Sequence, residues 1–600
     1  MGKLASLNRF FSKYRVRFGL GILFVLISNW FGVLPPQIIR HAIDLIVISI
    51  DTYRMFDGSF LQEAFYGAFT GFLLLFAVLV LILSVLKGLF MYFMRQTIIV
   101  MSRWIEYDLK NELYDKYQAL SLSFYRKNNT GDLMARISED VSKVRMYVGP
   151  AVMYGINLIA LFVFVITVMV KVNPELTFYV LMPLPVLAWG IYYVNNLILS
   201  RSTAIQQQLG QLTSFSQEAY SGIRVIKSYG REQSFSKLFT HELEDLKGKA
   251  MRLVKVEALY FPLTTLLIGL STIITVYMGG LQVAAGAITA GNIAEFVIYV
   301  NMLTWPVTSV GWVASIMQQA AASQQRIDAV LHQKSDIDNN VGKSILLQGD
   351  IRWDKVGFTY KQSGIQALQN ISFNLKPGQT LGIIGRTGAG KSTLANLMSR
   401  LYDPTEGKIF IDGEDITSLN PGDLRRQMGY VPQEVFLFSD SISNNISFGL
   451  DNFSEDQIER AAQQAALTPT LAALPDGYKT LLGERGVTLS GGQKQRLAIA
   501  RALIRKPKVY VIDDCLSALD TQTEKEILSN IHQLTRDTTT IIISHRISSV
   551  MHADQILVLD HGVLVASGTH DELLREGGFY NDIYQKQQQA ERDGQSLPID

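Results

Sequence analysis

The sequence has one cysteine and almost no net charge, and each shortage excludes a class of protein. Cys515 alone cannot form an intramolecular disulfide framework or a cysteine-rich metal site. The 55 lysines and arginines nearly balance 53 acidic residues, which leaves a formal charge of +2. Such a chain has no general basic field to bind DNA or RNA, so we expect no nucleic-acid partner.

Charged residues as a whole are also scarce. They make up 18% of the chain, whereas average soluble domains carry about 25%. Hydrophobic residues make up 48%. At 600 residues the chain is about four times the ~150-residue length of a typical domain, so it has room for several cores. These proportions indicate that part of the chain lies in a lipid bilayer.

Six long apolar stretches in the first half of the chain are predicted to cross a membrane. Each is near or above the ~20 residues that span a hydrocarbon core about 30 Å thick. Beyond residue 320 the apolar runs shorten to strand length and charged residues return. The expected spans are residues 17–40, 64–94, 146–171, 175–199, 257–280 and 290–317.

Basic residues set the expected orientation of these spans. The loops 95–145 and 201–255 carry nine lysines and arginines each, whereas the loop 41–63 carries only Arg54. The positive-inside rule therefore places both long loops, the N-terminus and the second half of the chain in the cytoplasm. We expect a multi-pass protein of the inner, cytoplasmic membrane.

Helices at the ends of the spans are expected to extend beyond the lipid. The span 64–94 corresponds to ~46 Å of helix at ~1.5 Å per residue, well beyond the ~30 Å of hydrocarbon. Long helical loops of this kind could carry force to a cytosolic domain. At the N-terminus, residues 1–16 place Leu4, Leu7 and Phe10 on one helical face, which predicts an amphipathic helix on the inner leaflet.

A glycine-rich loop in the second half has the pattern of a phosphate-binding loop. It follows the strand-like run 380–384 and precedes the helix-prone run 394–398, which is the context that this motif requires. Its glycines let backbone N–H groups converge on phosphate oxygens, and the helix N-terminus adds its dipole. Lys391 is expected to reach the β- and γ-phosphates, and Ser392 to ligate Mg²⁺. The loop consists of Gly385, Arg386, Thr387, Gly388, Ala389, Gly390, Lys391, Ser392 and Thr393.

Two further segments point to the same chemistry. The apolar run 509–512 ends at Asp513, which would place an oxygen ligand for Mg²⁺ beside the phosphate-binding loop. Ser490 is expected to cap a helix whose N-terminal amides, at Gly491 and Gly492, form a second anion site. The chain thus has two predicted phosphate-binding surfaces, which need not serve the same nucleotide.

These motifs resemble the ATP-binding cassette (ABC) family along nearly the whole chain. Residues 489–493, Leu-Ser-Gly-Gly-Gln, match the signature of that family, and its other elements occur in the expected order. The resemblance implies that Tyr360 stacks on adenine, that Gln433 belongs to the Q-loop and that His545 is the switch histidine. Residues 483–486 resemble the X-loop of exporters, and residues 517–520 resemble the D-loop.

The resemblance also implies an ATPase coupled to transport, with ATP and Mg²⁺ as its ligands. Catalytic roles would fall to Gln433, Asp514 and His545, and metal ligation to Ser392, Gln433 and Asp513. The implied ATP contacts are Tyr360, the loop residues from Gly385 to Thr393, and Ser490, Gly491, Gly492 and Gln493.

The order of the two halves resembles a half-transporter of the type I ABC exporter fold. In that fold a six-helix transmembrane domain is followed by an α/β P-loop nucleotide-binding domain. Residues 123–132 and 218–229 resemble the two coupling regions. Chains of this family work as dimers, with ATP between one chain's phosphate-binding loop and the other's signature, which would explain the two phosphate surfaces. The expected limits are 1–16 for the amphipathic helix, 17–320 for the transmembrane domain, 321–345 for a linker, 346–590 for the nucleotide-binding domain and 591–600 for a polar tail.

One position departs from the family pattern. Where the family has a catalytic glutamate after the metal-binding aspartate, this chain has Asp514, followed by Cys515. The aspartate is one methylene shorter, and a misplacement of ~1 Å can lower a rate ~10²-fold. In this family the change typically marks the weakened site of a heterodimer, so we expect a second half-transporter subunit as partner. A homodimer that uses Asp514 as a slow base is the alternative.

The transported molecule must be inferred from the membrane-spanning half of the chain. No ladder of carboxylates in the spans suggests a proton-driven route. We expect ATP-driven export, by alternating access, of an apolar or amphipathic drug or lipid, in contact with membrane lipid. The alternatives are a homodimeric lipid or peptide exporter, and a nucleotide-gated channel or regulator. Polar or aromatic residues within spans tend to face a cavity or each other. The candidates are Trp30, Tyr154, Asn157, Glu295, Asn301 and Trp305.

Overall fold

The computed structural model describes residues 2–56, 58–337, 342–483, 489–515, 521–534 and 538–592. The chain divides into two compact units. The first comprises Met1–Lys116 and Gly131–Gln333, and its described secondary structure is helical. The second comprises Tyr117–Thr130 and Lys334–Asp600 and holds the described strands. The segment Tyr117–Thr130 lies within the predicted limits of the transmembrane domain, but its contacts with Asp336 and Gln362 group it with the second unit.

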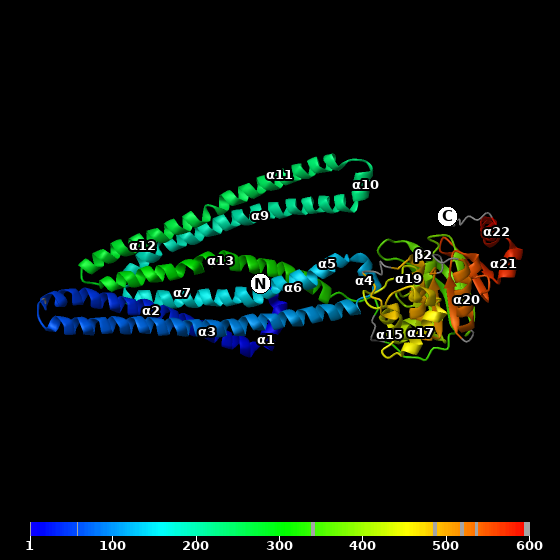
Figure 1. Cartoon of the computed structure of the whole chain (residues 1–600), viewed down its shortest axis with the longest axis horizontal. Helices are drawn as coiled ribbons and strands as arrows, with labels where there is room; N and C mark the ends of the chain where they lie inside the picture. The colour runs from blue at the N-terminus through cyan, green and yellow to red at the C-terminus, as the bar shows by residue number, and fades with distance from the viewer. Residues whose placement is uncertain are drawn as a thin grey trace. The chain divides into compact units, whose positions relative to one another are not determined.

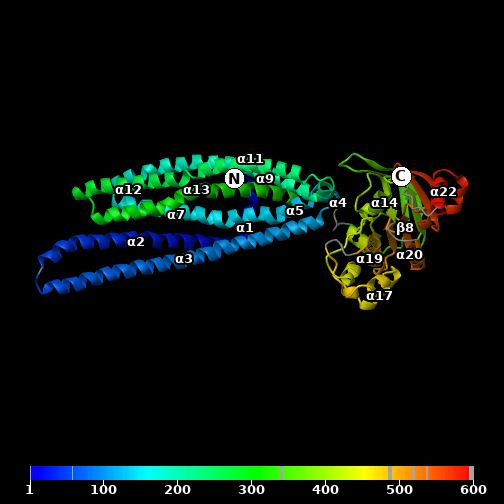
Figure 2. The ribbon, with the colours of Figure 1, turned by 45° about the horizontal axis from the view of Figure 1, so that its top comes forward.

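Long helices build the first unit (Figure 1). In both views α9 and α11 lie side by side, and α13 packs against α2, α7 and α12 (Figure 2). The helices of this unit, with their flanking turns, are η1 (Gly2–Leu7), α1 (Asn8–Lys13), α2 (Arg15–Met55), α3 (Leu61–Ala119), α5 (Thr130–Ala135), η2 (Arg136–Asp140), α6 (Val141–Met146), η3 (Tyr147–Ala151), α7 (Val152–Val172), α8 (Pro174–Leu181), α9 (Pro183–Ser221), α10 (Ile223–Ser228), α11 (Glu232–Glu257), α12 (Tyr260–Ala284) and α13 (Ala290–Leu331).

Among the described residues, six helical stretches are long and apolar enough to cross a membrane. Each contains one of the six spans predicted from the sequence. The second span lies within α3, which runs without interruption from Leu61 to Ala119 and is longer than the ~20 residues that cross ~30 Å of hydrocarbon. The six stretches are Arg15–Met55, Leu61–Ala119, Thr130–Val172, Pro174–Ser221, Glu232–Ala284 and Ala290–Leu331.

The N-terminal residues form the predicted helical segment ahead of the first span. Leu7 and Phe10 are buried, so the apolar face packs inward. The polar face forms ion pairs with α3, where Arg9 contacts Glu112 at 2.6 Å. The chain turns at Tyr14 before α2 begins, because Tyr14 leaves the helical region of φ and ψ. The apolar face is thus covered by the unit itself.

The third helical stretch, Thr130–Val172, contains two π-helical turns, η2 and η3, and Pro150 lies in the second. At η3 the backbone approaches α3 very closely. A Cβ built on Gly149 would lie 2.5 Å from Ser102 Oγ and 2.7 Å from Ser102 Cβ. Only glycine permits this approach without a shift of one helix.

Two sheets form the second unit. The smaller has the antiparallel order β2-β1-β4-β5, and the larger has the order β10-β9-β3-β8-β7-β6, in which all strands but β10 are parallel. The strands are β1 (Ile351–Thr359), β2 (Gln366–Leu375), β3 (Thr380–Gly385), β4 (Glu406–Ile411), β5 (Glu414–Asp415), β6 (Met428–Val431), β7 (Val509–Asp513), β8 (Thr539–Ile543), β9 (Gln555–Asp560) and β10 (Val563–Gly568).

Both faces of the larger sheet are covered. The near-continuous apolar strands β3, β7 and β8 are buried along their length, as expected for parallel strands between two layers. Side chains alternate between two cores: Ile541 and Ile543 face the smaller sheet, and Ile542 faces α19 and α20. The helices of this unit are α4 (Leu122–Lys127), α14 (Lys391–Met398), η4 (Ile416–Ser418), α15 (Pro421–Arg426), α16 (Ile442–Ser447), α17 (Glu455–Gln464), α18 (Thr468–Ala472), η5 (Gly477–Lys479), α19 (Gly491–Leu503), α20 (Thr521–Leu534), η7 (Ile547–Ser549), α21 (His570–Glu576) and α22 (Phe579–Arg592).

The close contact at η3 makes Gly149→Ala a test of this packing. The added methyl group would overlap both heavy atoms of the Ser102 side chain, so we expect a loss of about 1–3 kcal/mol in stability. The change is measured by heating the detergent-solubilised chain and using size-exclusion chromatography to determine how much folded protein remains at each temperature. Gly155→Ala is the matched control, because a Cβ there has no neighbour within 4 Å. Equal midpoints for the two variants would contradict the close packing.

Candidate nucleotide-binding site

Four neighbouring parallel strands of the larger sheet end at one edge, and each brings a predicted site residue there. β3 leads into the phosphate-binding loop, β8 precedes His545, β7 ends at Asp513, and β6 precedes Gln433. Ligands of open α/β sheets bind at the carboxyl ends of the strands. Sheet topology therefore joins motifs that are far apart in the sequence.

The phosphate-binding loop adopts a backbone that depends on glycine. Gly388 and Gly390 have φ values of +81° and +94°, in the left-handed region. At Gly390 a Cβ would also lie 2.4 Å from the carbonyl oxygen of Ala367 in β2. The loop is thus closed against the neighbouring strand, with its backbone amides available to an anion.

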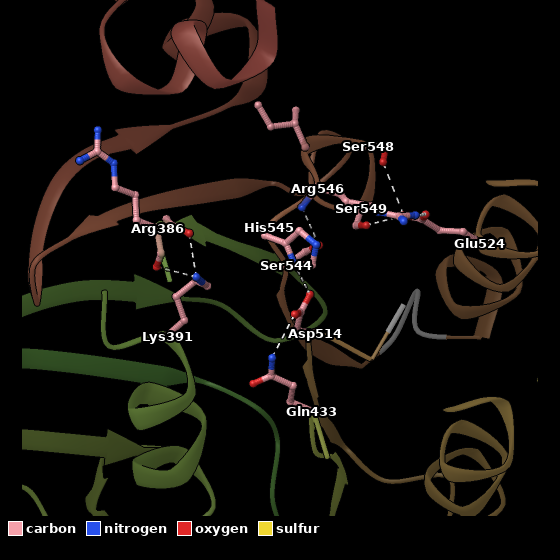
Figure 3. A network of polar contacts seen from close by, with 12 residues as sticks. Arg386, Lys391, Gln433, Asp514, Glu524, Ser544, His545, Arg546, Ser548 and Ser549 are labelled. Atoms are coloured by element: carbon pink, nitrogen blue, oxygen red, sulfur yellow. Dashed lines mark hydrogen bonds and ion pairs between the residues drawn. The ribbon is translucent and has the colours of Figure 1, made fainter. Parts of the chain in front are cut away.

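Lys391 opens α14 and reaches back across the loop (Figure 3). Its Nζ donates to the carbonyl oxygens of Gly385 and Arg386 at 2.7 and 2.9 Å. Burial lowers the pKa of Lys391, and the nearby carboxylates of Asp514 and Asp513 act in the opposite direction. An ammonium group within a loop of amides is suited to bind phosphate.

The surroundings of Asp513 fit a magnesium ion. Its side chain is buried, and Oδ1 accepts no hydrogen bond from any residue that the structure describes. Burial raises the pKa of Asp513, and a hydrogen bond with Ser392 partly opposes this shift. The described residues hold no cluster of three His, Cys, Asp or Glu for a metal. Mg²⁺ commonly uses only one or two carboxylates together with substrate phosphates, so this donor set is compatible with it.

Asp514 lies at the centre of a polar network (Figure 3). Its Oδ1 is 2.7 Å from His545 Nδ1, and its Oδ2 accepts a hydrogen bond from Gln433 Nε2 at 3.3 Å. The φ of Asp514 is +44°, a left-handed conformation that aspartate adopts more readily than most residues. The three residues expected to be catalytic are therefore in contact.

Most of the predicted catalytic, metal-binding and nucleotide-binding residues, taken together, line one pocket of about 490 Å³. Gly385, Arg386 and Ala389 are not among its lining residues, since Gly385 and Ala389 are buried within the loop and Arg386 points elsewhere. The lining residues that were predicted are Tyr360, Thr387, Gly388, Gly390, Lys391, Ser392, Thr393, Gln433, Asp513, Asp514 and His545.

Sequence reasoning missed five lining residues. Three of them lie at the start of β2, with Ile365 just before the strand and Gln366 and Ala367 as its first residues. The other two, His561 and Gly562, form the turn between β9 and β10. His561 and Gly562 both have positive φ, as a tight hairpin turn requires. The His-Gly pair between two apolar runs could have located this turn, although nothing local indicates that it faces the pocket.

A further residue that sequence reasoning missed is Arg126 of α4. Its guanidinium lies 5.3 Å from the ring centroid of Tyr360 and 5.5 Å from that of Tyr402. Nearby, Gln362 Nε2 donates to the carbonyl oxygen of Ser123 at 2.8 Å. The segment that resembles the first coupling region thus touches the aromatic residue expected to stack on adenine.

The second predicted anion site forms the N-terminus of α19. Ser490 Oγ accepts from the Gln493 N–H at 3.3 Å, and Gln493 Oε1 accepts from the Ser490 N–H at 2.9 Å. The glycines Gly491 and Gly492 are the first two helical residues. None of these four lines the pocket described above, so the described part of the chain keeps its two phosphate surfaces apart. The predicted D-loop, 517–520, and residues 484–486 of the predicted X-loop lie outside the described residues.

The candidate cavity residues of the first unit fall into two groups. Tyr154 packs edge-on against Trp305 and Trp312, with ring centroids 5.3 and 5.6 Å apart, and both tryptophans are about half exposed. Trp30, which packs against Phe164, is also exposed.

The polar candidates instead contact their own or neighbouring helices. Asn157 accepts a hydrogen bond from Asn29 at 2.9 Å, and Asn301 donates to a carbonyl of its own helix. Glu295 is fully buried, lies 3.3 Å from Arg40 and accepts a hydrogen bond from Tyr299. Glu295 therefore joins α13 to α2 and does not line a cavity among the described residues.

Known proteins resemble this chain along its whole length. Family models for the ABC transporter transmembrane region and for the ABC transporter match residues 18–307 and 368–517. A probable multidrug resistance ABC transporter ATP-binding/permease protein, YheI of Bacillus subtilis, is 35% identical over 98% of this chain and 97% of its own length. The multidrug resistance-like ATP-binding protein MdlA of Escherichia coli is 32% identical over 98% and 97%.

Two further similarities extend this comparison. An ATP-dependent lipid A-core flippase of Syntrophus aciditrophicus is 33% identical over 86% of each chain. The solved structure of a bacterial Atm1-family ABC exporter with ATP bound is 27% identical and covers 96% of this chain and 98% of its own, with a TM-score of 0.77.

The contact between Gly390 and β2 yields a test of the pocket. Gly390→Ala would bring a methyl group against the Ala367 carbonyl at a positive φ, so the loop must open and nucleotide affinity should fall at least ~10-fold. Binding of a fluorescent ATP analogue to the full chain measures this. The control is Gly413→Ala, which has a similar φ of +80° but no neighbour within 4 Å of a Cβ. Unchanged affinity in the Gly390 variant would refute the assignment of the loop.

Proposed function

Because this chain belongs to the ABC transporter family, with a transmembrane and an ATP-binding domain in one polypeptide, we propose that it exports an apolar or amphipathic molecule as one half of a dimer. Membership of this family supports ATP-driven export. The nature of the substrate, the identity of the partner and the roles of individual residues are proposed below. The observation that supports this proposal is the convergence of Lys391, Asp513 and Asp514 at one sheet edge, in a chain whose described residues include six helical stretches long and apolar enough to cross a membrane.

In the proposed site the loop amides and Lys391 hold the β- and γ-phosphates, and the Tyr360 ring stacks on adenine. Ser392, Gln433 and Asp513 would hold Mg²⁺, which neutralises charge on the phosphate oxygens when it is bound. The Oδ1 of Asp513, which is buried and accepts no hydrogen bond from the described residues, supports this role. The strand order of the larger sheet brings the segments that carry these residues to one edge.

Asp514 is the proposed base that orients the attacking water. Two features make it a weak one. Its carboxylate is one methylene shorter than that of glutamate, and both oxygens already contact protein, one at His545 and one at Gln433. A general base must lie within hydrogen-bond reach of the proton that it accepts. This supports slow turnover at the site of this chain.

The partner is proposed to be a second half-transporter. A complete site needs an anion-binding surface opposite the phosphate-binding loop, and the Ser490 cap of this chain lies outside the pocket. A partner's signature would face Lys391, and the intact signature of this chain would serve the partner's loop. The weakened base favours a heterodimer, in which the partner supplies the competent base.

The substrate is proposed to be apolar or amphipathic, with flat or aromatic parts. Within the first unit, the partly buried Tyr154 packs against two exposed rings, Trp305 and Trp312, and Trp30 presents another exposed ring. Aromatic side chains offer large apolar contact area with preferred stacking geometry. Two relatives have names that state multidrug resistance and one is a lipid A-core flippase, which supports a drug or lipid.

The same proposal places the chain in the cytoplasmic membrane, with its N-terminus and nucleotide-binding domain in the cytoplasm. The support is the concentration of basic residues in the loops 95–145 and 201–255. In this orientation we propose that α4 transmits the presence of nucleotide to the membrane helices, because the Arg126 guanidinium contacts the ring of Tyr360.

The heterodimer can be tested by removing one base at a time. Asp514→Asn should lower the ATPase activity of the assembled transporter by less than about twofold, because the competent site keeps its base. Replacing the matching acidic residue of the co-purified partner by its amide should cost ~10²-fold or more. Asp514→Glu serves as the conservative control and should not lower activity. Equal losses from the two amide variants would instead indicate two competent sites and contradict the weakened site, and purification of this chain without a second subunit would indicate a homodimer.

The role of α4 can be tested with Arg126→Ala. Each cation–π contact at an exposed site contributes ~0.5–1 kcal/mol, so export of a lipophilic fluorescent dye by inside-out vesicles should fall about two- to fivefold. ATP hydrolysis without dye should change less, since the phosphate contacts remain. Lys127→Ala, at the adjacent exposed position, should match the unaltered protein. An equal loss of transport in both variants would mean that total charge, and not the ring contact, matters.

A further inference from the structure

The loop that carries His545 is held by a side chain from the end of the described chain. Gln587 of α22 accepts a hydrogen bond from the Ile547 N–H through Oε1 at 2.9 Å. The Nε2 of the same amide donates to the carbonyl oxygen of His545 at 2.8 Å. One side-chain amide thus satisfies two backbone groups on either side of Arg546, as a neighbouring parallel strand would. β8 ends at Ile543, so no ladder supplies these bonds.

A second buried group fixes the loop from another direction (Figure 3). Glu524 of α20 is nearly fully buried and accepts hydrogen bonds from Arg546 Nη1 at 2.6 Å and from Ser549 Oγ at 2.5 Å. The backbone N–H of Arg546 donates to Ser544 Oγ at 3.0 Å. The loop is therefore fixed by side chains from α20 and α22, and these contacts set where the His545 imidazole lies.

The other end of α22 contacts the phosphate-binding loop. The guanidinium of Arg386 lies 5.1 Å from the centroid of the Phe579 ring, at the first residue of the helix. Between the two contacts the helix is anchored by Tyr580, which is 1% exposed and bonds to His570 Nδ1 through its hydroxyl at 2.7 Å. A single anchored helix thus touches both the loop that holds Lys391 and the loop that holds His545.

We propose that α22 is a positioning element of the ATP site, and that Gln587 is its positioning residue. The amide of Gln587 holds the backbone at His545 and so keeps the imidazole at 2.7 Å from Asp514. A displacement of ~1 Å in such a contact can cost ~10²-fold in rate. Anything that shifts or removes α22 would then alter turnover without touching a nucleotide contact. This inference rests on the role given to His545 under the proposed function.

The test uses the full chain in an assembled transporter whose partner carries the amide variant of the acidic residue that matches Asp514, so that the measured turnover comes from the site of this chain. Gln587→Met keeps the length and packing of the side chain and removes both hydrogen bonds, and Gln587→Glu keeps the acceptor and removes the donor. Gln588→Met is the matched control, since Gln588 bonds only to the Tyr584 hydroxyl of its own helix among the contacts described. His545→Ala sets the scale of the loss expected when the imidazole is absent.

Two measurements decide the proposal. In hydrogen exchange followed by mass spectrometry, the segment 544–551 of the Gln587→Met chain should exchange at least about fivefold faster, because the Ile547 N–H loses its acceptor. In steady-state ATPase assays kcat should fall by at least a third of the logarithmic loss seen in His545→Ala, with KM for MgATP within about twofold. Gln587→Glu should lie between the two, and Gln588→Met should match the unaltered protein.

The outcomes separate this inference from the proposed function. Unchanged exchange in Gln587→Met, or faster exchange with full turnover, would overturn the positioning role. A parallel rise in KM would also overturn it, because it would place the effect in nucleotide binding. If His545→Ala itself retained full turnover, the assignment of His545 would be wrong, and faster exchange would then support the clamp as a structural contact alone.

Discussion

The parallel pairing of β3, β8, β7 and β6 is the constraint on which the nucleotide site depends. The register places Ile543 beside both Ile383 and Asp513, so the residues that follow each strand emerge at one level. Because side chains alternate along a strand, a slip of one residue in β7 would turn Asp513 away from Ser392 and into a core. The two cores prevent such a slip, since Val511 must face one layer and Ile512 the other. Apolar packing thus sets the position of the charged groups.

Around this edge, polar contacts connect distant parts of the second unit. Asp514 joins the Gln433 and His545 segments, and Glu524 extends the network to α20. On the adenine side, Arg126 brings α4 against Tyr360. Because these contacts share residues, the energetic effects of substitutions within the network should not be additive. A substitution in one loop should therefore also affect the loops that share its contacts around the pocket.

Two kinds of signal were readable from the sequence. The spacing of glycines around Lys391 is local, and the left-handed φ values at Gly388 and Gly390 agree with it. The six spans follow from apolar length alone, and the helical stretches contain all of them. The capping residue Ser490 is also a local signal, because it bonds only three positions ahead. Features that depend on a few neighbouring residues or on average hydropathy were therefore predictable.

The features that could not be predicted depend on contacts between distant segments. Nothing near Arg126 indicates that its guanidinium lies over Tyr360. Glu295 could satisfy its charge in a wet cavity or against Arg40, and only the packing of α13 on α2 decides between them. The two hydrogen bonds of Gln587 likewise need α22 to lie against the loop that follows β8. Isolated polar residues carry no pattern, so their partners emerge only from the tertiary structure.

The unbroken length of α3 has a mechanical consequence. At ~1.5 Å per residue, the helix from Leu61 to Ala119 is a rod about 88 Å long. Sharp bends in helices arise at prolines and π-turns, and α3 has neither, whereas the helical stretch Thr130–Val172 has two π-turns and Pro150. If one end of such a rod is held, a tilt of about 5° moves the other end by about 8 Å. α3 is thus a lever arm, in which a small rotation at its end near Ala119 becomes a large displacement at Leu61.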